Sequence, residues 1–234
     1  MKQSAMDDTP GDPPRTRVYA ASDAEAWGEV LWVLRTGGVA VFPTDTVYGV
    51  GCDLWQPEAI EKLYWAKKRP KQRPISVLVS APEHAFLVAE CARLGGEALE
   101  RFEALTARFW PGGLTIILPR RPYVPDILCA GGPTIAVRMP DHSLALRLIA
   151  EMGGALAATS ANLSGRPAPC TAAGALADLD GRVHVILDGG DCPGGIASSI
   201  VDLGADAPVI LREGALDVET LREVLPDLIV PHKA

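Results

Sequence analysis

Residues 37–79 decide the fold and read GGVAVFPTDTVYGVGCDLWQPEAIEKLYWAKKRPKQRPISVLV. The apolar run Val39–Phe42 follows a pair of glycines and predicts a short buried strand. Pro43 ends that strand, because proline has no N–H to donate to a sheet. The next segment, Thr44–Gly49, is a loop rich in hydroxyl groups. Ligand crevices in open α/β sheets form where the chain leaves a strand, so this loop is a candidate binding site.

A dense cluster of positive charge follows the first helix of this stretch. Pro57 can occupy the first turn of that helix, which leads into Lys67–Pro74 (KKRPKQRP) and then a second strand at Ile75–Val79. The cluster is strongly basic although the whole chain carries a formal net charge of -7. Either it is a solvated helix end that complements the helix dipole, or it binds an anion. Pro70 and Pro74 stiffen the segment, which favours arginine contacts to a phosphate-rich ligand.

The composition indicates one compact domain with a sizeable core. The chain has 234 residues, 48% of them hydrophobic, and no apolar run reaches the roughly 18 residues that a membrane span needs. No secretory signal is visible, and five cysteines without a Cys-x-x-Cys pair suggest neither a disulfide framework nor a zinc site. We therefore expect a cytoplasmic protein with no membrane contact and no metal site. A pI of about 5.1 argues against a basic surface for duplex DNA but not against a basic groove.

The rest of the chain predicts helices and strands in alternation, followed by adjacent strands. Residues 1–17 are polar and rich in proline, so we expect a disordered leader before a single domain, residues 18–234. Strands separated by helices, and then strands without helices, imply a twisted mixed α/β sheet with packed helices. Helices are expected at 22–35, from Pro82, and at 97–109, 143–152 and 217–224, and strands at 115–118, 134–137, 155–159, 183–187, 198–203 and 209–211.

The usual signatures of nucleotide binding and hydrolysis are absent. The Gly-x-Gly at 49–51 lacks the third glycine of a dinucleotide fingerprint, and neither a P-loop nor a Gly-x-Ser-x-Gly sequence occurs. Ser160-Ala161-Asn162 follows a strand and is either a turn or a pair of neutral donors for one ligand, and Ser198 has the same ambiguity. Arg138 and Arg212 each follow an apolar strand, where an arginine is either an exposed strand end or a site residue.

Taken together, these motifs resemble the YrdC family over residues 27–230. They occur in the family's order: PTDTVYG, Lys67-x-Arg69-Pro70, WPGGLT (110–115), TIAVRMP (134–140), SANLSG (160–165) and LREGAL (211–216). The resemblance implies a YrdC-like fold, a twisted mixed sheet with packed helices around a large basic cavity. It also implies an enzyme that condenses L-threonine, bicarbonate and ATP into threonylcarbamoyl-adenylate and pyrophosphate. In that family a partner complex then moves the threonylcarbamoyl group to the adenosine beside the tRNA anticodon.

The same resemblance implies roles for individual residues, with Lys67 and Arg69 as the catalytic pair. No nucleophilic side chain is needed, because the threonine amine and bicarbonate give a carbamate whose oxygen attacks the α-phosphorus. The protein then acts mainly by positioning and electrostatics. The implied contacts to ATP, which carries Mg²⁺, are Lys67, Arg69, Arg73, Thr134, Ser160, Asn162 and Arg212, and those to threonine are Thr46, Arg138, Ala158 through its backbone, and Ser198.

Three departures from the family pattern bear on activity. Leu78 stands where many members have a histidine in contact with threonine, and Ala197-Ser198-Ser199 replaces a common Glu-Ser-Thr. The chain stops near residue 234, so we expect the extra C-terminal domain of the longer members to be absent. One relative branch lacks the Ser-x-Asn motif and is doubtful as a synthase. The presence of the Ser-x-Asn motif in this chain favours activity.

Two other functions stay open at this point. A basic cavity also suits a module that binds double-stranded RNA or tRNA, and a related enzyme would activate another carbamoyl or acyl group as its adenylate. Thr46, Arg138 and Ser198 make sense only for a small amino acid, which favours the synthase. The expected partners are therefore the small substrates and a tRNA-modifying transfer complex, with at most weak RNA binding.

Overall fold

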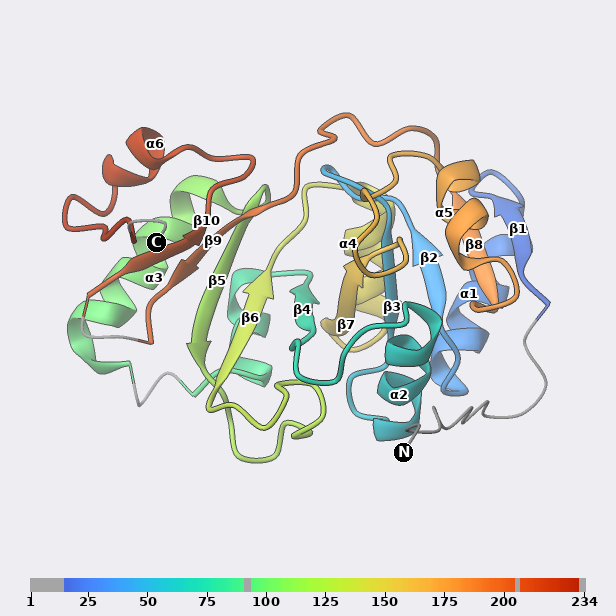
Figure 1. Cartoon of the computed structure of the whole chain (residues 1–234), viewed down its shortest axis with the longest axis horizontal. Helices are drawn as coiled ribbons and strands as arrows, with labels where there is room; N and C mark the ends of the chain where they lie inside the picture. Colours follow the sequence, from blue (N-terminus) through green and yellow to red (C-terminus); the bar gives the residue numbers. More distant parts are fainter. Residues whose placement is uncertain (1–14, 91–93, 205–206, 232–234) are drawn as a thin grey trace, which may run out of the picture.

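The described residues form a twisted mixed sheet of ten strands with helices packed against it (Figure 1). The structure is a computed structural model and describes residues 15–90, 94–204 and 207–231. The strand order is β1-β8-β2-β3-β7-β4-β6-β5-β9-β10, so β1 and β10 are the two edges. The expected leader falls largely on residues 1–14, which lie outside the described residues, and strand β1 begins at Arg17. The expected twisted mixed α/β sheet with packed helices is confirmed.

The bounds of the elements are as follows. The strands are β1 (Arg17–Ala20), β2 (Ala40–Phe42), β3 (Gly49–Cys52), β4 (Ser76–Val79), β5 (Leu114–Pro119), β6 (Thr134–Arg138), β7 (Ala155–Ser160), β8 (Val185–Asp188), β9 (Ser199–Asp202) and β10 (Val209–Arg212). The helices are α1 (Ala26–Arg35), α2 (Pro57–Ala66), α3 (Gly95–Phe109), α4 (Ser143–Glu151), α5 (Ala172–Leu179) and α6 (Val218–Arg222), with a 3₁₀ turn at Pro82–Leu87.

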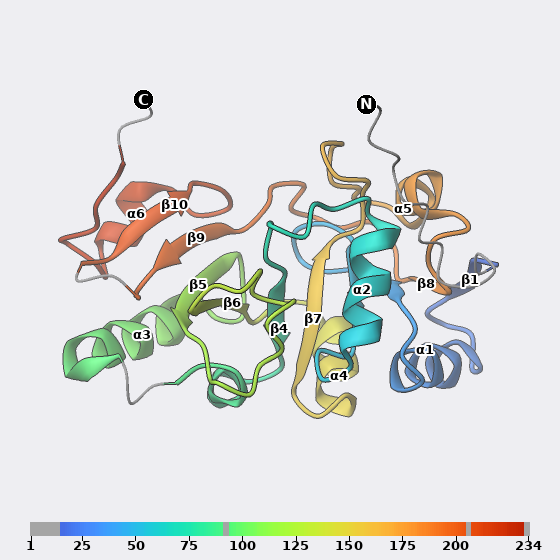
Figure 2. The same ribbon diagram turned by 60° about the horizontal axis from the view of Figure 1, so that its bottom comes forward.

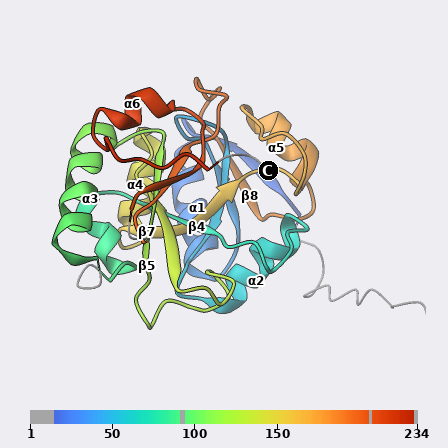
Figure 3. The ribbon, with the colours of Figure 1, turned by 60° about the vertical axis from the view of Figure 1, so that its left-hand side comes forward.

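Alternation along the strands gives the sheet two differently packed faces. In β2, Val41 belongs to the larger apolar core, whereas Ala40 and Phe42 belong to a smaller core that includes side chains of α1 and α4. The period of two in a strand produces this division, because successive side chains point to opposite faces. Figure 2 shows α1 and α4 on the same side of the sheet. Figure 1 shows α3 and α6 at the end of the sheet that carries β5, β9 and β10, and Figure 3 shows these two helices with that end turned forward.

Two strands and one helix escaped the sequence analysis. Strand β3 has glycine at two of its four positions, yet it pairs with both β2 and β7. Gly51 permits this, because a side-chain carbon there would meet the Ala157 carbonyl oxygen at 2.6 Å. Helix α5 is built mostly from alanine and glycine, so it has little apolar periodicity to detect. Strand β1 is short and largely exposed, which leaves no pattern of buried positions.

One predicted helix has a wrong start. The helix expected at 22–35 begins only at Ala26, because the Asp23 carboxylate accepts a hydrogen bond from the Ala20 N–H and holds residues 20–23 in a turn. The segment from Pro82 is a 3₁₀ turn rather than an α-helix. Among the described residues, none of the helices is both long enough and apolar enough to span a bilayer.

Candidate functional site

The pocket lies on the strand faces that the larger core leaves free. In β5, Leu114 and Ile116 are buried in that core, whereas Thr115 and Ile117 line the pocket. Strands β4 and β6 follow the same alternation, so a period of two builds the core and the site from the same strands. The volume of the pocket is about 690 Å³, which falls in the usual range for a small-molecule site.

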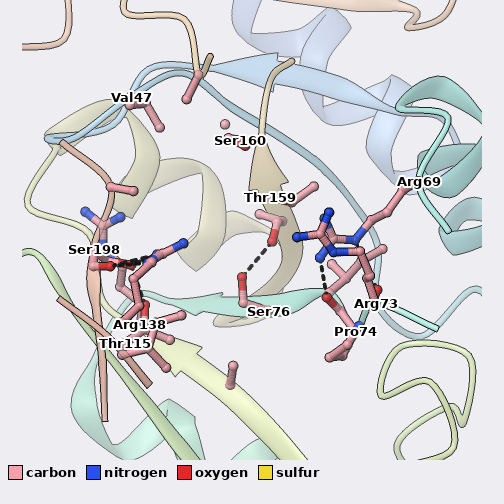
Figure 4. A pocket seen from close by; sticks show the side chains of 18 of the residues that line it. Val47, Arg69, Arg73, Pro74, Ser76, Thr115, Arg138, Thr159, Ser160 and Ser198 are labelled. Carbon is pink, nitrogen blue, oxygen red and sulfur yellow. Dashed lines mark hydrogen bonds between the residues drawn. The ribbon is translucent and has the colours of Figure 1, made fainter. Parts of the chain in front are cut away.

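All of the residues that the resemblance implied line this one pocket. Six of the residues that line it are cationic, and none of the lining residues is an aspartate or glutamate. Figure 4 shows Arg69 and Arg73 on one side of the pocket and Arg138 with Ser198 on the other. Their individual roles stay predictions. The six cations are Lys67, Arg69, Arg73, Arg138, Arg166 and Arg212.

Lys67 is buried, so it is not part of a solvated helix end. Its side chain is among the largest fully buried ones, and its residue is 1% exposed. The ammonium donates hydrogen bonds to the backbone carbonyl oxygens of Ser160 and Asn162, the latter at 2.7 Å. Lys67 therefore ties the end of α2 to the turn that follows β7.

The Ser160–Asn162 turn is also held from within. The Ser160 hydroxyl donates to Asn162 Oδ1 at 2.5 Å, and Asn162 Nδ2 donates to the carbonyl oxygens of Leu163 and Arg166. On α5, Asp178 accepts from the Leu163 N–H at 2.9 Å and from Arg166 Nη1 at 2.6 Å. The amide of Asn162 is thus used to shape the turn, and Asp178 supports it from behind.

Burial and neighbouring cations lower the pKa of Lys67 from its ordinary value of 10.5 to about 7. Desolvation is the largest cause, Arg69 and Arg73 add to it, and Asp178 acts in the opposite direction. A neutral lysine amine still has two N–H donors for the two carbonyl oxygens. The turn is therefore supported in either protonation state.

The two arginines of the stiff segment differ in their hydrogen bonds to the protein. Arg69 donates through Nε to the Arg73 carbonyl oxygen at 3.0 Å and through Nη2 to that of Pro74 at 2.8 Å. It therefore closes the loop that carries Arg73. Among the described residues, the Arg73 guanidinium has no hydrogen bond or ion pair. Arg73 is accordingly the cation most available to an anionic ligand.

At the other end, Arg138 is held by three groups. Its Nη2 pairs with the Asp45 carboxylate at 2.6 Å, Nη1 donates to Thr46 Oγ1 at 2.9 Å, and Nε donates to the Gly112 carbonyl oxygen. Burial lowers the pKa of Arg138, and the Asp45 carboxylate acts in the opposite direction, so it offsets part of the cost of burying this guanidinium. One N–H on each terminal nitrogen is left over, which suits a second carboxylate.

A second polar group lies beside Arg138. Arg212 donates through Nε and Nη2 to the carbonyl oxygen of Ser198, and the Ser198 hydroxyl lies 2.7 Å from Thr115 Oγ1. A side-chain carbon at Gly214 would collide with the backbone of Ala197 and Ser198, so the glycine lets this loop approach Ser198. Arg212 and Ser198 were predicted as site residues, whereas Thr115 was not.

Asp45, Thr115 and Asp178 were not predicted as site residues. Asp45 and Thr115 lie inside motifs that were singled out from the sequence, and their polarity beside a strand end was the available signal. Asp178 offers no such signal, because it lies 15 residues beyond Leu163 on a helix that was not expected.

The residues of the pocket do not form a metal site. Its lining contributes hydroxyl, amide and backbone oxygens but no carboxylate, the ligand that Mg²⁺ prefers in proteins. Among the described residues, no group of three or more His, Cys, Asp or Glu side chains is placed to hold a metal ion.

The fold and the pocket define a class: a mixed α/β protein with a cation-lined pocket that has arginines at both ends. The family whose model matches residues 32–214 is Sua5/YciO/YrdC, described as "Telomere recombination". The chain belongs to this family.

Curated relatives carry the name threonylcarbamoyl-AMP synthase. The Bacillus subtilis protein is 43% identical over 194 residues, and the match covers 82% of this chain and 54% of that protein. The Pyrococcus abyssi protein is 37% identical over 83% of this chain and 56% of its own length. A putative threonylcarbamoyl-AMP synthase of Mycobacterium tuberculosis is 35% identical over 82% of this chain and 85% of its own. The chain thus spans little more than half the length of the first two.

Solved structures show the same fold. Sua5 of P. abyssi in complex with L-threonine superposes with a TM-score of 0.83 at 34% identity, covering 92% of this chain and 62% of that one. YciO of Escherichia coli gives a TM-score of 0.74 at 23% identity over 89% of this chain and 99% of that one.

The buried Lys67 predicts a pH-dependent stability. Between about pH 7 and 10.5 the unfolded chain keeps a proton that the folded chain has lost, so the free energy of unfolding rises with pH by up to about 1.4 kcal/mol per unit. Below about pH 7 both states are protonated and the full penalty of burying the charge is present. Denaturant unfolding measures the free energy of unfolding of the wild type and of Lys67→Met across this pH range. The value for the wild type minus that for the variant should grow with pH. A constant difference, like that expected for the exposed Lys71→Met, would contradict it.

Proposed function

We propose that the chain is an L-threonylcarbamoyladenylate synthase, which condenses L-threonine, bicarbonate and ATP. The observation that carries this proposal is the division of one pocket into two ends. A stiff segment with Arg69 and Arg73 occupies one end, and Arg138 with its ordered partners occupies the other. An ATP molecule and a small amino acid have charges that match these ends. The names of the curated relatives support the same substrates.

ATP occupies the end formed by residues 67–73 and the turn after β7. Arg73 and the unused N–H groups of Arg69 contact phosphate oxygens, because guanidinium groups suit phosphate geometry. Thr134 and Ser160 are further predicted contacts on the pocket wall, with Asn162 shaping the turn. Arg212 is also predicted to contact ATP, but from the side of the pocket that carries Ser198 and Arg138. Lys67 acts mainly by fixing Ser160, since its ammonium touches protein carbonyl groups.

Threonine occupies the opposite end, with its carboxylate on Arg138. Thr46 and Ser198 lie beside that arginine, and the backbone of Ala158 borders the pocket where the amino group would lie. The amine and bicarbonate give a carbamate with loss of water. A carbamate oxygen then attacks the α-phosphorus, the bond to the β-phosphate bridging oxygen breaks, and pyrophosphate leaves. The chain holds the two reactants in line and offsets negative charge.

Magnesium enters this scheme only with ATP. The lining of the pocket has no carboxylate to hold a metal ion, so phosphate oxygens and water would hold it. Such an ion neutralises phosphate charge when bound. The cations of the wall complete that neutralisation, and they are the part this chain supplies.

The product is unstable in chemical terms, being a mixed anhydride, and needs an acceptor. We place the protein in the cytoplasm beside a tRNA-modifying transfer complex that takes the threonylcarbamoyl group. A module for double-stranded RNA is a second function that the cations alone would also serve. The ordered pair of Asp45 and Arg138 at one end favours the enzyme, because a nucleic acid backbone offers no carboxylate.

The direct test is pyrophosphate release by the purified chain. It should require both threonine and bicarbonate, and omission of either should stop ATP consumption. The adenylate should be detectable as threonylcarbamoyl-AMP by mass spectrometry. Absence of turnover, combined with tight RNA binding that resists salt, would favour the RNA module instead.

Arg73→Ala should weaken ATP binding by about 1.5–3 kcal/mol, roughly 10- to 150-fold, the usual contribution of a hydrogen bond to a charged group. The free guanidinium of Arg73 motivates this expectation. Lys71→Ala is the matched control, because Lys71 lies in the same segment, is exposed and, within the described part of the chain, pairs only with Glu61. Calorimetry should show a large loss for Arg73→Ala and little change for Lys71→Ala. Equal losses would point to long-range charge rather than a phosphate contact.

Leu78 should make the site less strict toward serine. It is buried, lines the pocket and offers only apolar contact at a position where the family resemblance implies a histidine. Selectivity for threonine over serine then rests on packing around one methyl group, which gives about 1–3 kcal/mol, or roughly 10- to 200-fold. Adenylate formation at equal concentrations should therefore be detectable with serine and stronger with threonine. Complete rejection of serine would show that another polar group reads the hydroxyl, and a preference for valine would exclude threonine as the substrate.

A further inference from the structure

The WPGGLT motif contains a buried hydroxyl that the proposed function has not used. Trp110 donates through Nε1 to the Leu114 carbonyl oxygen at 2.8 Å, which fixes the start of β5. Thr115 follows directly, is 5% exposed, and lines the pocket. Among the described residues, its hydroxyl has one hydrogen-bond partner, Ser198 Oγ at 2.7 Å. A threonine hydroxyl has one donor and two acceptor lone pairs, so this single bond leaves some of its hydrogen-bonding capacity unused.

The protons of this cluster can be counted. Arg212 Nη2 donates to Ser198 Oγ at 3.1 Å, and an arginine cannot accept. Ser198 and Thr115 together have two O–H groups, and only one of them is used in the bond between the two oxygens. One hydroxyl proton therefore stays available. Hydrogen bonds in a chain polarise one another, which favours the order Arg212 to Ser198 to Thr115 and leaves the free proton on Thr115.

The register of the sheet places this proton beside Arg138. Thr115 and Arg138 are directly paired across β5 and β6, so their side chains leave the same face of the sheet as close neighbours. Both line the pocket, and Figure 4 shows Thr115, Ser198 and Arg138 gathered at one side of it. A carboxylate on Arg138 then has a hydroxyl donor within reach of its second oxygen.

We propose that Thr115 is a further substrate-binding residue, which donates its hydroxyl proton to the carboxylate of the amino acid at the end of a chain from Arg212 through Ser198. This inference rests on the proposed function and adds a residue to its amino-acid end. It gives a role to the hydrogen bond that Arg212 donates to the Ser198 hydroxyl. The donor and Arg138 together match one carboxylate, which in the proposed function is that of the amino acid.

The test compares three substitutions by steady-state kinetics of adenylate formation. Thr115→Val keeps the shape of the side chain and removes only the hydroxyl, and it should raise the KM for threonine about 5- to 20-fold while the KM for ATP changes less than twofold. Thr115→Ser should restore most of the loss. Thr106→Val is the matched control: Thr106 is equally buried, but its hydroxyl bonds to helix carbonyls of α3 away from the pocket, so both KM values should stay unchanged.

Coupling and a second substrate make the test specific. In a Ser198→Ala background, Thr115→Val should have a much smaller effect, because the chain is already broken. The penalty of Thr115→Val should be the same for threonine and for L-2-aminobutyrate, which keeps the carboxylate and lacks the hydroxyl. A penalty seen only with threonine would overturn the assignment to the carboxylate. If Thr115→Val does not fold, Thr115→Ala replaces it under the same criteria.

The inference and the proposed function fail in different ways. An unchanged KM for threonine in a folded Thr115→Val, beside a fully active wild type, overturns the inference alone. A wild type that makes no adenylate from threonine overturns the function and the inference with it.

Discussion

The site depends on one buried ammonium group. Lys67 lies at the end of α2, and its Nζ is hydrogen-bonded to two carbonyl oxygens of the turn after β7. Burying a charge without partners costs several kcal/mol, so those carbonyl groups are required. In return, the cationic segment from Lys68 onward is held at a fixed position relative to Ser160. A helix end that was solvated instead would leave both sides of the phosphate-binding end free to move.

The cations that line this pocket repel one another. Burial and Arg73 lower the pKa of Arg69, and burial and Arg138 lower that of Arg212, so these cations disfavour one another. Two carboxylates offset part of this charge, Asp45 against Arg138 and Asp178 against Arg166. An anionic ligand relieves the repulsion that is left. Such preorganised cations favour binding of charged reactants, because little of the protein has to rearrange.

Much of the fold was predictable from local pattern. The strand β2 and the helix α2 follow from an apolar run, a proline that ends it and a proline at a helix start. Strand β3 was not predictable in this way, because its glycines permit a close approach to β7. That strand lies more than a hundred residues further along the chain. Helix α5 likewise depends on packing of small residues rather than on periodicity.

The residues of the candidate site also fall into a group that was predictable from local sequence and a group that was not. Its cations and hydroxyl groups stand out in short motifs, and the family resemblance brought them together. What escaped were the residues that hold them: Asp45 against Arg138, Thr115 against Ser198, and Asp178 behind the turn. Thr115 and Ser198 are 83 residues apart in the sequence, and Asp45 and Arg138 are 93 apart. Local sequence patterns do not predict contacts over such separations.

The most direct test of this account is a crystal structure of the chain with L-threonine and an ATP analogue that cannot release pyrophosphate. The account predicts the phosphates on Arg73 and Arg69, the threonine carboxylate on Arg138, and Lys67 still on the carbonyl groups of Ser160 and Asn162. The threonine nitrogen should then face the α-phosphate with room for one carbonate-sized group between them. Phosphates bound at Arg138, or a Lys67 that has left the turn to contact ATP, would contradict it.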